Sequence, residues 1–164
     1  MACFSQHHDN VHRVSDMKEA TIRRATSDDA PALAELGATT FIEAFGQLYS
    51  PEDLQAFLEE SHSLAAYAKV LANPDYALWI AEKDGRAIGY AQAGPCGLPH
   101  DDVRPGDGEL KRLYLLKPEQ NGGVGLALFE QALAWLEREG PRPLSLSVWS
   151  ENLGAQRFYG RHGF

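Results

Sequence analysis

The sequence predicts a single α/β domain with a mixed central sheet flanked by helices. Its 164 residues are a length typical of one domain. Strand-like and helix-like runs alternate in the order strand, helices, two strands, strand, helix, strand, helix. A glycine-rich turn, Gln120 to Gly125, joins one strand-like run to the longest helix-like run. The sequence has no internal repeat and no low-complexity segment, and nothing in it indicates a second domain.

The N-terminal residues differ from the rest of the chain. Residues 1–18 are polar and rich in histidine, without hydrophobic periodicity, which predicts a disordered tail. The domain is then expected to span residues 19–164. The sequence has neither the apolar core of a signal peptide nor an apolar run of membrane-spanning length. We therefore expect a cytoplasmic protein that does not contact membranes.

Helices are expected to dominate the first half of the domain. Residues 21–25 form a strand-like run. Ser27 is expected to cap the first helix, because two aspartates and Pro31 follow it in the first turn. Ser50 is expected to cap a second helix that begins with a proline. A third, short helix is expected over residues 64–71.

The second half is expected to carry most of the sheet. Asp84-Gly85 is a favoured two-residue turn, so the runs on either side of it should form a hairpin. A loop is expected between Gly94 and Gly108, which holds four glycines and three prolines. The expected elements are strands at 76–82, 87–93, 109–116 and 144–148, and helices at 125–139 and 152–161.

Composition excludes several classes of function. The net charge of −8 makes the chain unlike a nucleic-acid-binding protein, while it suits a cationic small substrate. The two cysteines, Cys3 and Cys96, are far apart and form no CxxC pair, so neither a disulfide framework nor a zinc site is indicated. The histidine spacings match no metal-ligand pattern, and we expect no metal.

The glycine-rich turn is expected to bind phosphate. Glycines let a ligand approach the backbone closely, and the start of a helix supplies unpaired N–H groups and partial positive charge. Two common phosphate sites do not match. A P-loop would need lysine and a hydroxyl residue where Leu126 and Ala127 follow Gly125. A dinucleotide fingerprint would need a small residue where Leu128 stands.

Two ordered motifs resemble the GNAT family of N-acetyltransferases. The first is Gln120-x-x-Gly123-x-Gly125, placed directly after the strand-like run Glu109 to Leu116. The second is the closing segment 146–164, with Asn152, Ala155, Phe158-Tyr159 and Gly163-Phe164. The opening residues 21–30 are also typical of these enzymes, so the resemblance covers residues 20–164. It implies an acyl-CoA N-acyltransferase fold.

The resemblance implies acetyl-CoA as co-substrate. In the family, backbone amides of the turn bind the pyrophosphate, and the strand before it pairs with the pantetheine arm. The positions that match are Leu113, Tyr114, Leu115, Gln120, Asn121, Gly122, Gly123, Val124, Gly125, Leu126, Asn152 and Tyr159. Asn152 resembles the residue that hydrogen-bonds the coenzyme arm, and a helix N-cap is the alternative role.

Catalytic roles follow from the same resemblance and from amine chemistry. An amine with a pKa near 10 is almost fully protonated at pH 7, so a base is needed. Glu109 is the candidate base, and the alternative is a carboxylate paired with Lys111. Glu43 is a weaker candidate, better placed to bind a cationic substrate. The N–H of Leu113 is expected to face the acetyl oxygen.

Tyr159 resembles the family's general acid, which protonates the leaving thiolate. Its ordinary pKa near 10 keeps the phenol protonated at pH 7. The alternative is a tyrosine packed by its ring, with the hydroxyl bonded to backbone.

The identity of the amine that accepts the acetyl group is the property that the sequence determines least. Residues 40–45 and 48–54 resemble the PaiA-type branch, which is associated with polyamine acetylation. The resemblance implies direct transfer to a small cationic amine in a ternary complex. A protein or peptide amine, or a non-catalytic acyl-CoA sensor, are alternatives. Relatives usually continue beyond Gly163-Phe164, so the C-terminal strands are expected to be absent, and a partner chain, as in a homodimer, could cover that edge.

Overall fold

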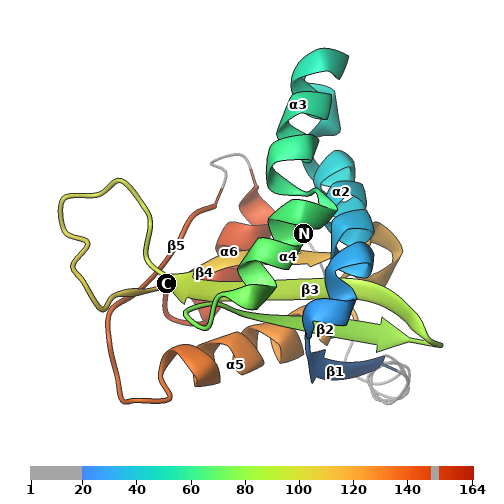
Figure 1. Cartoon of the computed structure of the whole chain (residues 1–164). Coiled ribbons are helices and arrows are strands. Elements are labelled where there is room, and N and C mark those ends of the chain that lie inside the picture. Colours follow the sequence, from blue (N-terminus) through green and yellow to red (C-terminus); the bar gives the residue numbers. More distant parts are fainter. Residues whose placement is uncertain (1–19, 149–151) are drawn as a thin grey trace.

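The computed structural model describes residues 20–148 and 152–164. The expected disordered tail lies outside the described residues. One sheet has the strand order β1-β2-β3-β4-β5 (Figure 1). The first four strands pair antiparallel and β5 pairs parallel to β4, so the predicted mixed sheet is confirmed. The strands are β1 (Ala20–Arg24), β2 (Ala77–Lys83), β3 (Arg86–Pro95), β4 (Gly108–Leu115) and β5 (Leu144–Leu146).

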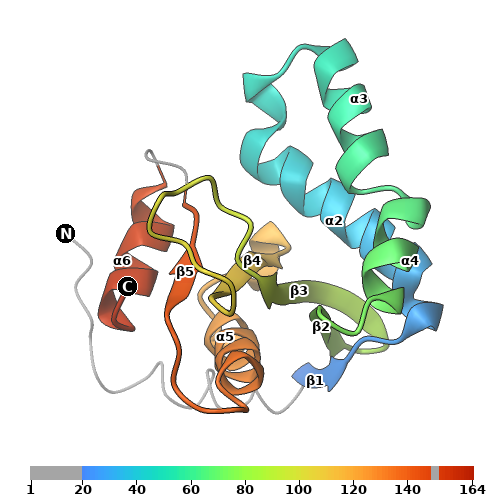
Figure 2. The same ribbon diagram turned by 60° about the vertical axis from the view of Figure 1, so that its left-hand side comes forward.

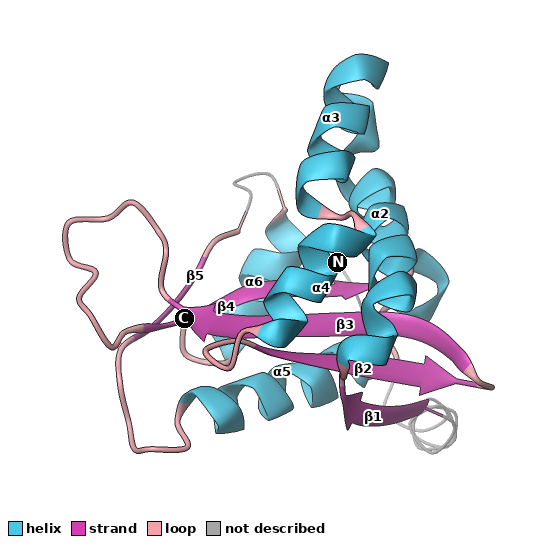
Figure 3. Cartoon of the chain, viewed as in Figure 1, coloured by secondary structure: helices cyan, strands magenta, loops and turns pink. Residues whose placement is uncertain are grey.

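Helices cover both faces of the sheet, as Figure 3 shows. Helices α2 and α4 pack on one face, and α5 and α6 lie on the other. The helices are α2 (Ala30–Phe45), α3 (Pro51–Ser61), α4 (Leu64–Ala72), α5 (Val124–Leu136) and α6 (Leu153–Arg161). Short 3-10 turns are η1 (Ser27–Asp29), η2 (Gly46–Leu48) and η3 (Lys117–Glu119). No helix of this described part of the chain combines the length and apolar content that crossing a membrane requires.

Strand β2 shows how the sequence builds two cores. Trp79 and Ala81 contribute to the core under α5, whereas Leu78 and Ile80 contribute to the core under α2 and α4. Side chains alternate between the faces of a strand, so a strand covered on both faces needs apolar residues at every position. This accounts for the continuous apolar run of β2.

The predicted turns and caps are mostly confirmed. Asp84 and Gly85 both have positive φ, 52° and 74°, as the predicted two-residue hairpin turn requires. The Ser50 hydroxyl accepts a hydrogen bond from the N–H of Asp53 over 3.1 Å, which confirms the cap of α3. The predicted cap at Ser27 is wrong, because Ser27 lies inside η1 and Thr26 is the residue that precedes it.

The Asp29 carboxylate explains the different start of the first helix. It accepts from the N–H of Thr26 over 2.7 Å and from both terminal nitrogens of Arg23, at 2.7 and 2.8 Å. These bonds hold the N-terminal turn against β1. The Arg23 hydrogen bonds lower the pKa of Asp29 to about 2, against the opposing effect of burial.

Several predicted boundaries shift. The loop predicted from Gly94 begins later, because β3 continues through Pro95. The predicted helix 125–139 begins at Val124 and ends at Leu136, followed by Gly140 with φ of 117°. The strand predicted at 144–148 ends at Leu146.

The short β5 leaves much of β4 unpaired. The two strands pair only over Gly108–Leu110 and Leu144–Leu146. Beyond this point β5 separates from β4 and leads toward α6, while the α2–α3 hairpin projects from the other face (Figure 2). Residues 111–115 of β4 therefore have a free edge among the described strands.

Candidate active site

The free edge of β4 presents backbone donors. The N–H of Leu116 donates to the carbonyl of Ile88 over 2.8 Å, toward β3. Because N–H groups alternate in direction along an extended chain, those of Leu113 and Leu115 point away from β3, to the free edge. Their side chains pack into the core under α5. The structure thus leaves the backbone of these two predicted residues accessible to a ligand lying along β4.

The glycine-rich turn follows directly after this edge. Asn121 and Gly123 both adopt positive φ, 67° and 89°, a conformation that glycine and asparagine tolerate best. The Gln120 amide lies 3.4 Å from the carbonyl oxygen of Leu115 and ties the turn to the end of β4. Gly123 is the N-cap of α5 and brings no capping side chain.

The start of α5 can therefore accept an anion. Its first N–H groups lack a side-chain cap, and the helix adds partial positive charge at this end. The side chains of Val124 and Leu126 are apolar and pack in the core, so the only donors at these two positions are backbone N–H groups. The turn fits a diphosphate bound through backbone donors.

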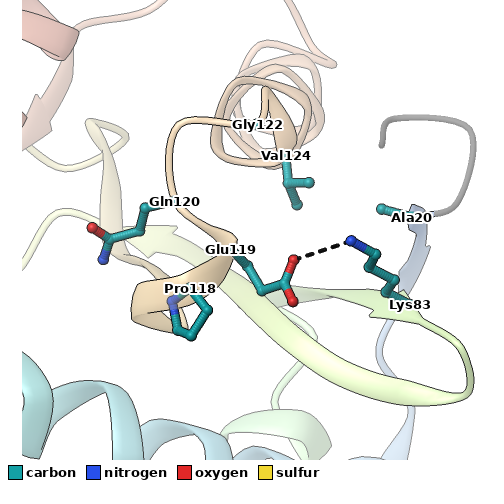
Figure 4. Close-up of a pocket in the computed structure, with 7 residues that line it drawn as sticks. All are labelled: Ala20, Lys83, Pro118, Glu119, Gln120, Gly122 and Val124. Carbon is teal, nitrogen blue, oxygen red and sulfur yellow. Dashed lines mark ion pairs between the residues drawn. The ribbon is translucent and has the colours of Figure 1, made fainter. Parts of the chain in front are cut away.

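A small pocket lies beside the turn, lined by Ala20, Lys83, Pro118, Glu119, Gln120, Gly122 and Val124 (Figure 4). Within it the Glu119 carboxylate forms an ion pair with Lys83 at 3.5 Å, and Arg86 lies 4.0 Å away. These two cations of the β2–β3 hairpin pair with Glu119 and link η3 to the sheet.

Tyr159 packs by its ring between α5 and α6. Its ring centroid lies 5.9 Å from Phe129 and 5.3 Å from Phe158. Burial, with a smaller effect of the Tyr114 phenol, raises the pKa of Tyr159 to about 12. The hydroxyl bonds to no residue in the described part of the chain, so the backbone-bonded alternative is not observed.

Asn152 is the N-cap of α6. Its side-chain oxygen accepts from the N–H of Ala155 over 3.0 Å. The amide nitrogen of the same side chain has no partner among the residues that the structure describes and can still donate to a ligand. The structural alternative for Asn152 is thus observed, and a coenzyme contact remains compatible with it.

Glu109 is buried and paired. Its Oε2 accepts from the ammonium group of Lys111 over 2.8 Å and from the N–H of Gly97 over 2.9 Å. Only 7% of the residue is exposed. Its Oε1 accepts no hydrogen bond from a described residue, so one oxygen of the carboxylate can still take a proton.

Glu43 has a backbone role. Its Oε2 accepts from the N–H of Lys117 over 2.9 Å and joins α2 to the residue that opens η3. The side chain is exposed.

The predicted residues fall into two groups. Leu113, Leu115 and Tyr159 pack against the same core under α5, and the turn follows directly after β4. Glu109 lies near the start of β4, opposite Ser145, and no hydrogen bond or ring contact joins it to Tyr159.

A buried polar cluster was missed by reasoning from the sequence. His62, Tyr67, Tyr90 and Arg112 meet beneath α2 and α4. Their sequence separations leave no local signal. In β4 itself Arg112 directly follows Lys111, so its presence in the sequence indicates neither burial nor a partner. No cluster of three or more potential metal ligands occurs in residues 20–148 and 152–164.

Comparison with known sequences identifies relatives along most of the chain. The model of the acetyltransferase (GNAT) family matches residues 39–164. An uncharacterised N-acetyltransferase of Mycobacterium bovis is 37% identical over 136 residues, which cover 83% of each chain. An uncharacterised N-acetyltransferase of Lactobacillus delbrueckii subsp. lactis is 30% identical over 147 residues, covering 90% of this chain and 85% of the relative.

Solved structures show the same fold. PaiA N-acetyltransferase from Thermoplasma acidophilum, in complex with coenzyme A, superposes with a TM-score of 0.74 and 22% identity, covering 88% of this chain and 89% of that one. The aminoglycoside N-acetyltransferase AAC(6')-Iy, also in complex with coenzyme A, gives a TM-score of 0.66 and 22% identity, covering 88% and 87%.

Proposed function

The chain belongs to the acetyltransferase (GNAT) family, and on this premise we propose that it transfers the acetyl group of acetyl-CoA to a primary amine. The acceptor we propose is a small cationic amine such as a polyamine. Transfer is direct, with both substrates bound at once.

The free edge of β4, continuous with the uncapped start of α5, is the observation that carries this proposal. Acetyl-CoA supplies an acetyl thioester at one end of a flexible arm and a diphosphate toward the other. The turn from Gln120 to Leu126 fits the diphosphate, and the edge from Leu113 to Leu115, with Tyr114 between, fits the arm. The free amide nitrogen of Asn152 is a further donor to the arm.

Leu113 has the electrostatic role. Negative charge develops on the acetyl oxygen during transfer, and a fixed backbone N–H at the free edge stabilises it. A preorganised donor of this kind lowers the activation free energy by roughly 3 kcal/mol.

Glu109 takes the proton of the amine, directly or through water. One oxygen is held by Lys111 and Gly97, which orients the carboxylate, and Oε1 remains to accept the proton. Tyr159 gives a proton to the leaving sulfur, and its raised pKa keeps the phenol protonated over the working pH range.

The choice of a cationic acceptor is supported by charge and by likeness. The net charge of −8 favours association with cations. The solved neighbours include a PaiA N-acetyltransferase and an aminoglycoside N-acetyltransferase. Aminoglycosides, like polyamines, carry several protonated amino groups.

The test is the release of coenzyme A thiol with a panel of spermidine, an aminoglycoside, amino acids and a lysine-containing peptide. We expect turnover with the multiply charged small amines above the others, and acetylated product by mass spectrometry. Turnover confined to the peptide contradicts the acceptor class. Calorimetric binding of coenzyme A without turnover of any amine contradicts catalysis and indicates an acyl-CoA sensor.

A further inference from the structure

Four polar side chains form a connected cluster inside the core beneath α2 and α4. The Tyr67 hydroxyl donates to the Tyr90 hydroxyl over 3.0 Å and lies 2.9 Å from Nδ1 of His62. Arg112 donates to the Tyr67 hydroxyl over 2.9 Å. His62 is 5% exposed, and Tyr67 and Tyr90 are 1% and 0% exposed. The cluster joins the α3–α4 junction to β3 and β4.

Arg112 is the charged member. No carboxylate of the described residues lies within ion-pair distance of its guanidinium, which donates to the main-chain carbonyl of Ser61 over 3.1 Å. A partly buried cation is costly unless its donors are satisfied, so these neutral acceptors determine where the side chain can lie. The bond to Ser61 joins the last residue of α3 to β4.

Helix α3 depends on such ties because it buries no residue of its own. It projects from the sheet beside α2 (Figures 1 and 2), and its Phe57 ring stacks on Phe41 of α2 at 4.6 Å. The aromatic contact fixes α3 to α2, which is itself packed on the sheet. The bond from Arg112 to Ser61 adds a direct tie between the last residue of α3 and β4.

A second tie lies at the other end of the free edge. Glu43, near the end of α2, accepts from the N–H of Lys117. Arg112 immediately precedes Leu113, and Lys117 follows soon after Leu115. The two ties therefore flank the segment of β4 that we propose to bind the acetyl arm.

Helix α2 also packs directly on the cluster. A Cβ added at Gly37 would lie 2.2 Å from the Tyr67 hydroxyl and 2.6 Å from Nδ1 of His62. No side chain fits between helix and cluster, so displacement of the cluster is transmitted to α2.

We propose that Arg112 is a positioning residue that holds the α2–α3 hairpin over the free edge of β4 and thereby determines how the acceptor amine is seated. The inference rests on the proposed function, since it concerns the acceptor side of the same site. Arg112 acts through Ser61 and Tyr67 and does not itself touch the reacting atoms.

The test compares Arg112→Lys and Arg112→Met with the wild-type enzyme. Lysine keeps the charge, but its ammonium group ends one atom short of the position of Nη1, the arginine nitrogen that donates to both Ser61 and Tyr67. We expect the KM for the amine to rise about tenfold or more, while the KM for acetyl-CoA and kcat at saturating amine stay within about threefold. Hydrogen exchange should accelerate in residues 46–61 and stay unchanged in β2 and β3.

Gly37→Ala provides an independent variant, because it displaces the cluster while Arg112 is retained. It should reproduce the rise in amine KM. Arg138→Met is the matched control: Arg138 stacks on Trp135 of α5, 4.0 Å from the ring centroid, on the opposite face of the sheet. It should leave both KM values unchanged.

A lowered melting temperature with unchanged amine KM overturns the proposal, as does an equal rise in both KM values. If no amine is acetylated by the wild-type protein, the proposed function fails by itself. The hydrogen-exchange experiment then still tests whether Arg112 holds the hairpin. Unchanged exchange in residues 46–61 of Arg112→Met overturns that role.

Discussion

The ammonium group of Lys111 lies 2.8 Å from Oε2 of Glu109, and the two side chains share a largely buried site at the start of β4. The sequence left two interpretations of Glu109 open, a catalytic base and a carboxylate paired with Lys111, and this geometry allows both. Pairing with Lys111 is observed, and it leaves the second carboxylate oxygen without a partner among the described residues. The same geometry is compatible with the base role that we propose for Glu109.

Two variants of this pair separate catalysis from structure. Glu109→Gln and Lys111→Met both remove the ion pair, but only the first removes the proton acceptor. We expect kcat to fall about 100-fold in Glu109→Gln, within the usual range for loss of a general base, and less than about fivefold in Lys111→Met. Steady-state rates at saturating acetyl-CoA measure this. Equal losses in the two variants would show that the ion pair itself is what matters.

Tyr159→Phe removes a hydroxyl that bonds to no described residue. We expect kcat to fall about 100-fold as a general acid is lost, with the melting temperature nearly unchanged. Because the pKa of Tyr159 is raised to about 12, the wild-type phenol stays protonated below that pH, and activity should not decline on the alkaline side up to about pH 10. A pH–rate profile of both proteins checks this, and an unchanged kcat in the variant rejects the acid role.

Gly125 and Gly122 offer a matched pair in the turn. A Cβ at Gly125 would meet Cδ1 of Leu115 at 3.3 Å, so the branches of valine should push the turn away from β4. A Cβ at Gly122 would meet nothing closer than the carbonyl oxygen of Glu119 at 3.9 Å. We expect Gly125→Val to weaken coenzyme A binding about tenfold and Gly122→Val to change it less than about twofold. Calorimetric titration measures both, and equal affinities would argue against binding at this turn.

His62 should make stability depend on pH. Burial, and then the charge of Arg112, lower its pKa from 6.5 to about 4. Between these values the unfolded chain binds a proton that the folded chain does not, so stability present above pH 6.5 is lost as the pH falls toward 4. The loss at about pH 4.5 should approach 2 to 3 kcal/mol.

His62→Gln removes the titrating group and keeps a polar side chain. Urea unfolding of both proteins at pH 7 and about pH 4.5 isolates the histidine, because the carboxylates titrate in both. The variant should lose less stability on acidification. Equal losses would mean that His62 is not held neutral by its surroundings.

The local signals in the sequence were sufficient for the elements themselves. Asp84-Gly85 favours positive φ at two successive positions and therefore a hairpin, and Ser50 offers a hydroxyl to the first turn of α3. The cap predicted at Ser27 was wrong, because the Asp29 carboxylate binds both Arg23 and the backbone of Thr26 and so moves the start of the helix. The arginine is distant enough that no local pattern includes it.

The sequence by itself predicted the mixed α/β fold, which the structure confirms, and a phosphate-binding turn with residues that resemble a coenzyme site, which stay predictions. These follow from short-range backbone preferences and from motifs of contiguous residues. The tertiary structure alone decided that β5 leaves β4 after Leu146 and exposes the N–H groups of Leu113 and Leu115. It also decided that Arg112 meets Ser61 and Tyr67, residues about 50 positions away. Such contacts depend on how the helices pack across the sheet, and the spacing of residues along the chain does not predict that packing.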